Sequence, residues 1–147
     1  MKPKRILVPT DYSPCADRAL ELALQFADHY QAALDLVHAY QVPADVYPYS
    51  LYITDKHLKG FKERHEEQMK RLCEDTRQRG ARVEGVVLQG ETHDVIPNFA
   101  KAQKVDLIIM GTRGRGGLPH LLLGSTAERT VRLATCPVIT VPPSPEA

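Results

Sequence analysis

The sequence predicts an α/β fold: an open, doubly wound, five-stranded parallel sheet in the order 3-2-1-4-5, with four helices on its two faces. Short apolar runs alternate with amphipathic segments, so the expected element order is βαβαβαβαβ. The length of 147 residues suits one domain, residues 1–147, with a full core. Distinctive polar segments follow the first and fourth strands, and they face one crevice if these two strands are neighbours.

The first half of the chain is expected to begin with two strands, at residues 5–9 and 34–39, joined by a helix. Ser13 is the expected N-cap of this helix and Pro14 its first residue. Small apolar residues recur at three- and four-residue steps, which lets the helix lie close to the sheet. Residues 41–54 have no clear period, and we expect a partly ordered loop whose three tyrosines pack on the domain beneath.

A charged segment over residues 55–79 predicts a long second helix, with Gly80 at the C′ position that ends it. Its charges are expected to form a solvated face, and His65 is expected to fill the apolar stripe rather than to bind a ligand. The predicted inward face consists of Leu58, Phe61, His65, Met69, Leu72 and Thr76.

The third strand is predicted at residues 82–88, and residues 90–96 are expected to open the third helix. Pro97 must lie in the first turn of this helix or kink it, because proline lacks the N–H that a helix interior needs. The residues expected to point inward are Val95, Ile96, Phe99 and Ala100.

The fourth strand, at residues 105–110, is an apolar run typical of the centre of a parallel sheet. A glycine-rich loop leads from it into a helix over residues 125–134, where Ser125 and Glu128 fit a capping box. The last strand, at residues 137–141, has prolines before and after it. It is therefore expected at an edge of the sheet, since proline cannot continue a central ladder.

Charge and cysteine content restrict the classes of function. Nineteen Lys and Arg nearly balance 18 Asp and Glu, so no overall field attracts nucleic acid or a membrane surface. Cys15, Cys73 and Cys136 have no metal or redox spacing, and no signal-peptide core is evident, which indicates a reduced, cytoplasmic setting. No apolar run approaches the roughly 20 residues that span a bilayer.

The loop after the fourth strand has the composition of an anion site. Gly111, Gly114 and Gly124 allow the backbone to approach a phosphate, and Ser125 begins a helix whose N–H groups attract anions. Across the expected crevice, Asp11 could accept a hydrogen bond from a base or ribose hydroxyl. A plainer interpretation is that the glycines only make tight turns, Ser125 only caps a helix and Asp11 only holds its own turn. Neither a P-loop nor a dinucleotide fingerprint is present.

The motif Gly-x2-Gly-x9-Gly-Ser/Thr, formed by Gly111, Gly114, Gly124 and Ser125, resembles the ATP-binding motif of the universal stress proteins. The resemblance extends over nearly the whole chain. It includes the opening segment 6–13, strand two, strand four and the closing segment Cys136-Pro137-Val138-Ile139-Thr140-Val141.

The resemblance implies a set of ligand contacts, a divalent ion such as Mg²⁺ beside the phosphates, and a homodimer formed through the edge strand Val138–Val141. Ala39 stands where valine is commoner in the family, but the contact there is largely made by backbone. A phosphate contact by His120 is less expected than a solvent-exposed position. The implied adenine and ribose contacts are Pro9, Thr10, Asp11, Ala39, Met110 and Gly111, and the implied phosphate contacts are Gly114, Arg115, Gly124, Ser125 and Thr126.

The leading hypothesis is an ATP-binding regulatory protein of the stress response that binds an unidentified protein partner in a nucleotide-dependent way. No catalytic residue and no protein-only metal site are predicted, because no positioned base or nucleophile accompanies the loop. One alternative is a slow ATPase, or an enzyme that phosphorylates itself at Ser125 or Thr126. Another is a sensor of AMP or cyclic AMP, because the base pocket cannot count phosphates.

Overall fold

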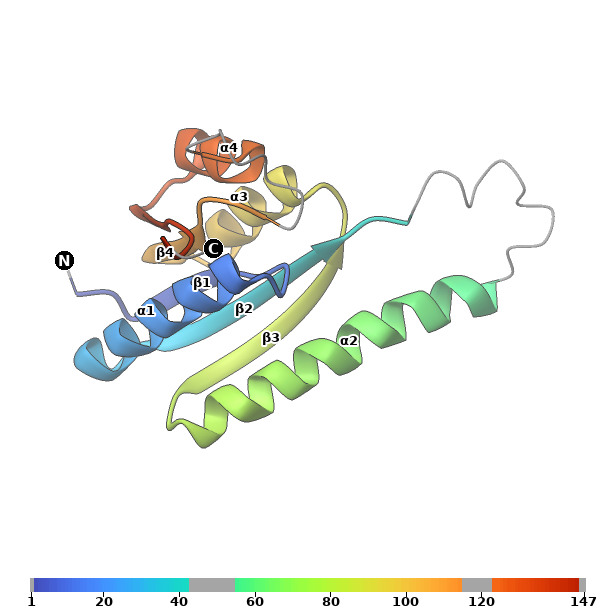
Figure 1. Ribbon diagram of the computed structural model, residues 1–147, viewed down its shortest axis with the longest axis horizontal. Coiled ribbons are helices and arrows are strands. Elements are labelled where there is room, and N and C mark those ends of the chain that lie inside the picture. The colour runs from blue at the N-terminus through green and yellow to red at the C-terminus, as the bar shows by residue number, and fades with distance from the viewer. Residues whose placement is uncertain (1, 43–54, 115–122, 146–147) are drawn as a thin grey trace.

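The computed structural model describes residues 2–42, 55–114 and 123–145. Within these residues the chain forms five strands and four helices in strict alternation (Figure 1), as predicted. The predicted loop at 41–54 lies outside the described residues, apart from Gln41 and Val42. The elements in chain order are β1 (Arg5–Pro9), α1 (Pro14–Tyr30), β2 (Ala33–Tyr40), α2 (Asp55–Gln78), β3 (Arg82–Gln89), α3 (Thr92–Ala102), β4 (Leu107–Gly111), α4 (Ser125–Leu133) and β5 (Val138–Val141).

All strand pairs in the sheet are parallel, and the strand order is β3-β2-β1-β4-β5. This confirms the predicted fold class, including the pairing of β1 with β4 and the edge position of β5. Because parallel strands end at the same edge, the segments after β1 and β4 lie side by side. The same residues that predicted a shared crevice are thus brought together by the topology.

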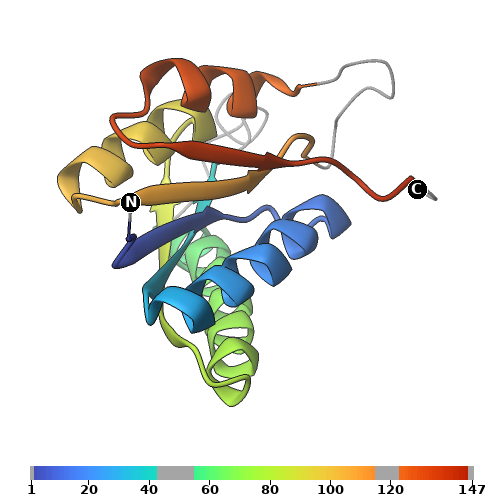
Figure 2. The same ribbon diagram turned by 90° about the vertical axis from the view of Figure 1, so that its left-hand side faces the viewer.

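Helices cover both faces of the sheet, α1 and α2 on one face and α3 and α4 on the other (Figure 2). In β1, Ile6 and Val8 contribute to the cluster beneath α1 and α2, whereas Leu7 belongs to the cluster beneath α3 and α4. All three side chains are fully buried. Each such side chain contributes about 1.5–3 kcal/mol through burial. The alternation of β1 therefore builds a core on both faces.

The start of α1 follows the sequence prediction. The Ser13 side chain accepts a hydrogen bond from the Ala16 N–H at 3.2 Å, and Pro14 is the first helical residue. Ala19 and Ala23 are fully buried. Their small side chains let the helix axis approach the sheet, which fixes the position of the loop between β1 and α1.

The inward face of α2 differs in part from the prediction. Met69 and Thr76 are buried as expected, but Cys73 is also buried, and Leu58 is exposed. The physical reason lies in β3, where Gly85 has no side chain. A Cβ at Gly85 would lie 2.6 Å from Met69 Cγ, so α2 packs directly on the strand backbone.

The end of α2 and the start of α3 each differ from the sequence prediction. α2 ends at Gln78, one residue before the predicted end, and Gly80 has a φ of +90°, as a C′ glycine should. Of the two alternatives expected for Pro97 in α3, the position in the first turn is excluded, and the kink stays a prediction. The helix begins at Thr92, so Pro97 is in its second turn, where it leaves the His93 carbonyl without the usual helical N–H.

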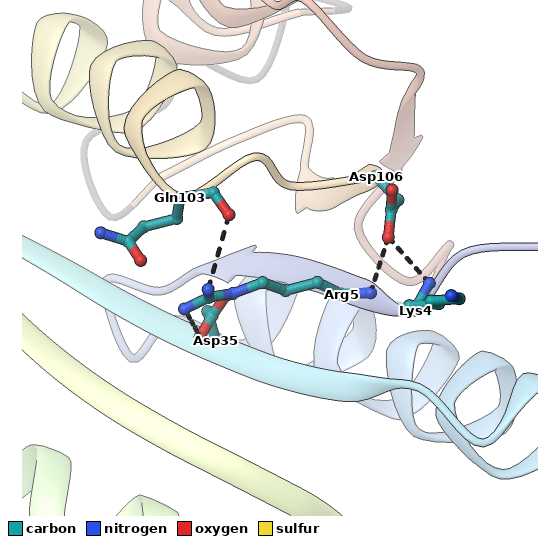
Figure 3. Close-up of polar contacts among 5 residues, drawn as sticks. All are labelled: Lys4, Arg5, Asp35, Gln103 and Asp106. Atoms are coloured by element: carbon teal, nitrogen blue, oxygen red, sulfur yellow. Dashed lines mark hydrogen bonds and ion pairs between the residues drawn. The ribbon is translucent and has the colours of Figure 1, made fainter.

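Polar contacts hold the amino-terminal end of β1 (Figure 3). One carboxylate oxygen of Asp106, which precedes β4, accepts the N–H groups of Lys4 at 2.8 Å and Arg5 at 2.9 Å. The Arg5 side chain donates from Nε and Nη2 to the two carboxylate oxygens of Asp35 in β2, at 2.5 and 3.1 Å. Arg5 therefore links the three central strands at this end.

Among the described residues, no helix has the length and apolar character needed to cross a bilayer.

Candidate functional site

A cavity of about 460 Å³ opens at the carboxyl ends of β1 and β4. Its volume falls within the range of about 300–1,000 Å³ typical of small-molecule sites. All ten predicted site residues that the structure describes line it, and Arg115 and His120 lie outside the described residues. The lining residues are Pro9, Thr10, Asp11, Ala16, Ala39, Thr92, Met110, Gly111, Thr112, Arg113, Gly114, Gly124, Ser125, Thr126 and Ala127.

The loop after β1 forms one wall and is held by its own side chains. The Thr10 N–H donates to the Val37 carbonyl at 2.9 Å, which extends the pairing of β1 with β2. The Thr10 hydroxyl accepts the Tyr12 N–H at 3.0 Å, and Asp11 Oδ1 accepts the Ser13 N–H at 3.0 Å. These are the local turns that threonine and aspartate side chains favour. Asp11 therefore holds its own turn, and this leaves Oδ2 directed toward the opposite wall.

Glycines form the opposite wall because larger residues would collide with the structure around them. A Cβ at Gly114 would lie 2.9 Å from Asp11 Oδ2, and a Cβ at Gly124 would lie 3.1 Å from the Thr112 carbonyl oxygen. A Cβ at Gly111 would lie 3.2 Å from backbone atoms of Cys15 in α1. Each glycine of the motif thus marks a close approach, and together they leave room for a ligand beside the backbone.

The predicted capping box at the start of α4 is wrong. The helix begins at Ser125 itself, and its N-cap is Gly124, with no side-chain capping hydrogen bond. The Gly124 N–H donates to the Thr112 carbonyl at 2.7 Å, and the Gly124 carbonyl accepts the Glu128 N–H at 2.9 Å. These two bonds move the boundary by one residue. The Ser125 side chain is therefore a lining group of the cavity and not a cap.

The amino terminus of α4 supplies the electrostatic character of the cavity. The first N–H groups of a helix have no partners within the helix, and the dipole gives this end a partial positive charge. Among the described lining residues, the charged side chains are Asp11 and Arg113. No group of three His, Cys, Asp or Glu side chains arranged for a metal ion occurs in the part of the chain that the structure describes.

Some lining residues were not predicted. Thr92 is the first residue of α3 and comes to the cavity from the helix that covers the far face of β2. Thr112 follows β4 and is buried, with its hydroxyl unpaired among the described residues. Ala16 and Ala127 contribute from the first turns of α1 and α4. Thr112 occupies an unspecified position of the glycine motif, whereas the other three residues lie outside any motif and reach the cavity through helix packing.

The cysteines show no features of a reactive thiol. Burial raises the pKa of both Cys73 and Cys136, so these thiols stay protonated at neutral pH. Cys15 is buried beneath the cavity, and its Sγ donates to the Val141 carbonyl at 3.3 Å. The polar groups of the site are therefore backbone donors, hydroxyls, the Asp11 carboxylate and the Arg113 guanidinium, a set suited to binding a polar ligand.

A larger hollow of about 630 Å³ lies at the other end of the sheet, but its three arginine side chains are engaged. Arg5 is paired with Asp35, Arg77 donates to the Val83 carbonyl at 3.1 Å, and Arg82 donates to a carbonyl in the turn before β2. Open α/β sheets bind ligands at the carboxyl ends of their strands. The smaller cavity is therefore the better candidate site.

Comparison with known proteins gives a consistent result. The universal stress protein family model matches residues 2–142. Universal stress protein MJ0531 of Methanocaldococcus jannaschii is 32% identical over 138 residues, which cover 94% of this chain and 81% of that protein. The solved structure of MJ0577 from the same organism superposes with a TM-score of 0.84 at 27% identity, covering 98% of this chain and 99% of that one.

Two more distant solved structures share the fold and contain a nucleotide. One is a universal stress protein in complex with cyclic AMP, with a TM-score of 0.71 at 23% identity, covering 98% of this chain and 100% of that one. The other is an Arabidopsis thaliana family protein with AMP bound, with a TM-score of 0.67 at 20% identity, covering 98% and 94% of the two chains. At these identities the likeness concerns the fold.

Proposed function

The chain belongs to the universal stress protein family, and from this premise we propose that it is an ATP-binding regulatory protein of the stress response. In this role the nucleotide changes the surface that the protein presents to a partner. The observation that carries the proposal is the cavity: ten residues of the family's nucleotide pattern, from four separate segments, line one space.

Different lining residues would contact different parts of the nucleotide. Pro9, Thr10 and Asp11, with Ala39 across from them, would hold adenine and ribose, with the Asp11 carboxylate accepting from a hydroxyl or amino group. Met110 and Gly111 would lie along the ribose, as in the family pattern. The residues proposed for adenine and those proposed for ribose all lie at the carboxyl ends of β1, β2 and β4.

The phosphates would lie against Gly114, Gly124, Ser125 and Thr126, with Arg115 contributing charge from the loop. Backbone N–H groups at the start of α4 and two hydroxyls are donors suited to phosphate oxygens. A Mg²⁺ ion would accompany the phosphates, held by their oxygens, by water and by at most one carboxylate. Asp11 is the carboxylate among the described lining residues.

The number of phosphates is the finer part of the proposal. Structures of family members contain cyclic AMP or AMP, which supports adenine nucleotides as a class and favours a nucleotide sensor as the second candidate function. ATP is proposed because the glycines of the motif and the N–H groups at the start of α4 add donors and backbone space beyond the implied ribose contacts, which suits a chain of phosphates. Affinity for ATP, ADP, AMP and cyclic AMP distinguishes the two candidates.

The test is denaturing mass spectrometry of ligand extracted from freshly purified protein, together with thermal shifts in a series of the four nucleotides. A ligand present at 100 times its Kd adds about 2.7 kcal/mol to the free energy of unfolding. We expect ATP with Mg²⁺ to give the largest shift. If no nucleotide is recovered and none raises the melting temperature, the proposal is wrong.

A matched pair of variants sharpens this test. Asp11→Asn keeps an oxygen that can accept the Ser13 N–H, so the loop is preserved while the charge is removed. We expect ATP affinity to fall about tenfold, the effect of losing one hydrogen bond to a charged group. Glu67→Gln removes a carboxylate from the exposed face of α2 and is expected to leave affinity unchanged. The same Asp11 variant tests hydrolysis. If the wild type releases phosphate over many turnovers and Asp11→Asn abolishes this release, an ATPase is favoured.

A homodimer through β5 is part of the proposal. The Pro137 carbonyl accepts the N–H of Ile108 in β4, and the Val141 carbonyl accepts that of Thr112 just after it. The alternating backbone groups of Val138 and Thr140 therefore face the outer edge of the sheet. Thr140→Pro removes the outward N–H without removing a hydrogen bond to β4, whereas Thr140→Ala keeps this N–H. Light scattering should give a dimer for the wild type and the alanine variant and a monomer for the proline variant. A dimer in all three would exclude this interface.

The setting and organisation of the protein complete the proposal. The three cysteines are free thiols, which supports a reducing compartment such as the cytoplasm. Residues 1–147 would act as one nucleotide-binding domain. Limited proteolysis with and without ATP tests this, because a single domain gives one protected core whose rate of cleavage falls when the nucleotide binds.

A further inference from the structure

Two histidines lie directly behind the loop that forms the β1 wall of the cavity. His38 in β2 is buried, and its Nδ1 lies 2.8 Å from the Thr10 carbonyl oxygen. Its other ring nitrogen, Nε2, lies 3.0 Å from Nδ1 of His65 in α2. His65 is on the inward face of α2, as the sequence predicts, but it has a polar partner that the sequence did not reveal.

The contacts determine which nitrogen of each ring carries a proton. A carbonyl oxygen only accepts, so His38 must donate to Thr10 from Nδ1. In a neutral His38, Nε2 is then an acceptor, and His65 must donate to it from Nδ1. The bond to Thr10 thus fixes the tautomer of His38, and the bond to His38 fixes the tautomer of His65. A continuous chain of donors runs from α2 to the Thr10 carbonyl.

Aromatic rings hold both histidines in place. The His65 ring stacks on Tyr40 at 4.9 Å between centroids and meets the edge of Phe61 at 4.9 Å. The Tyr12 ring lies 4.7 Å from His38, and Tyr12 reaches this position with a φ of +61°, a left-handed conformation that is rare for a bulky residue. Strain of this kind is maintained only where the surrounding structure determines it.

We propose that His38, oriented by His65, is a positioning residue for nucleotide binding that fixes the peptide between Thr10 and Asp11. In a trans peptide the Thr10 carbonyl and the Asp11 N–H point in opposite directions. A donor behind the wall therefore sets how this peptide, which joins two cavity-lining residues, is turned toward the ligand. The inference rests on the proposed function and extends it to residues outside the cavity.

The surroundings of His65 favour its neutral state. Burial lowers the pKa of His65, and the neighbouring His38 and Arg64 lower it further through the repulsion between like charges. Among the described residues, the other rings that contact the pair are those of Tyr12, Tyr40 and Phe61. In a neutral pair each ring has one N–H, and both protons are used in the chain of donors toward Thr10.

The first test compares two amides at position 38. The amide nitrogen of His38→Asn reaches the place of Nδ1 and can still donate to Thr10, whereas the amide of His38→Gln reaches the place of Nε2 and cannot. We expect the Gln variant to bind ATP about five- to tenfold more weakly than the wild type, the effect of one lost hydrogen bond. The Asn variant should recover affinity to within about threefold. Equal affinity of the two variants would overturn the proposal.

The second test needs no variant at position 38. Long-range ¹H–¹⁵N correlation spectra of the wild type should show His38 protonated at Nδ1, both without ligand and with saturating ATP. His65→Phe keeps a ring against Tyr40 and Phe61 but removes the N–H, so His38 should lose its single tautomer and ATP affinity should fall about twofold to threefold. A His38 ring protonated at Nε2 in the wild type would overturn the proposal. Absence of any nucleotide binding by the wild type would instead overturn the proposed function on which it rests.

Discussion

The ion pair between Arg5 and Asp35 allows a prediction in which the two partners differ. The Asp35 side chain is 4% exposed, whereas that of Arg5 is 34% exposed. Arg5→Met therefore leaves a carboxylate buried without its two N–H donors. Removing one partner of a buried pair costs about 3–5 kcal/mol. Because Arg5 itself is partly exposed, water can reach the site, and we expect a loss of about 3 kcal/mol, at the lower end.

The reverse substitution should cost less. Asp35→Asn leaves an arginine that can turn toward water and toward the Gln103 carbonyl, which it already approaches at 3.5 Å. We expect a loss of about 1 kcal/mol, typical of one hydrogen bond. In the double variant no buried charge remains, so the loss should be about 2 kcal/mol, smaller than that of Arg5→Met alone. The two substitutions are thus predicted to be non-additive.

Urea denaturation at pH 7, followed by far-ultraviolet circular dichroism, measures these differences, since the chain has no tryptophan. The pair lies near the amino ends of β1 and β2, whereas the cavity lies at the carboxyl ends of β1 and β4, so ATP affinity should not change in any of the three variants. The reasoning is refuted if Asp35→Asn is as destabilising as Arg5→Met, or if the losses in the double variant simply add.

Three further predictions concern stability. The His65 pKa is lowered from 6.5 by burial, so the unfolded chain takes up the proton first; the free energy of unfolding should fall as pH drops below about 6.5, and less so in His65→Phe. If the urea midpoints of the wild type and of His65→Phe shifted equally between pH 7.5 and 5.5, this prediction would be contradicted. Gly80→Ala forces a side chain onto a φ of +90° and should cost about 1 kcal/mol by the same assay, unlike Gly60→Ala. Glu21→Gln should change stability by less than about 0.5 kcal/mol, because Glu21 and Arg79 are both about half exposed.

The fold could be predicted because its signals are local and repeated. Ser13 and Pro14 mark the start of α1, and the prolines around β5 indicate an edge strand. The order of the strands required chemistry as well. The segments at Thr10 and Gly111 fit one ligand only if β1 and β4 are neighbours, and this is the arrangement found.

What the sequence could not show depends on how elements pack. Cys73 is buried because Gly85 admits α2 to the backbone of β3, and the spacing of α2 alone does not indicate this. Thr92 lines the cavity because α3 packs across β2, although nothing in its neighbourhood marks a ligand. His38 and His65 are 27 residues apart, and their contact depends on the position of a helix over a strand. Each case is a contact between elements that local patterns leave undetermined.

The incorrect capping box bears on the function more directly than any of the correct boundaries. Had Ser125 been the N-cap, its hydroxyl would have accepted an N–H of its own helix. With Gly124 as the N-cap, held by Thr112 at 2.7 Å, the Ser125 hydroxyl and the first N–H groups of α4 remain with the cavity. A glycine N-cap is less favourable than a serine N-cap by only a few tenths of a kcal/mol, but it supplies no side-chain acceptor for the first N–H groups of the helix. A nucleotide phosphate at this place would supply the missing acceptors, so binding and helix stability are expected to be coupled.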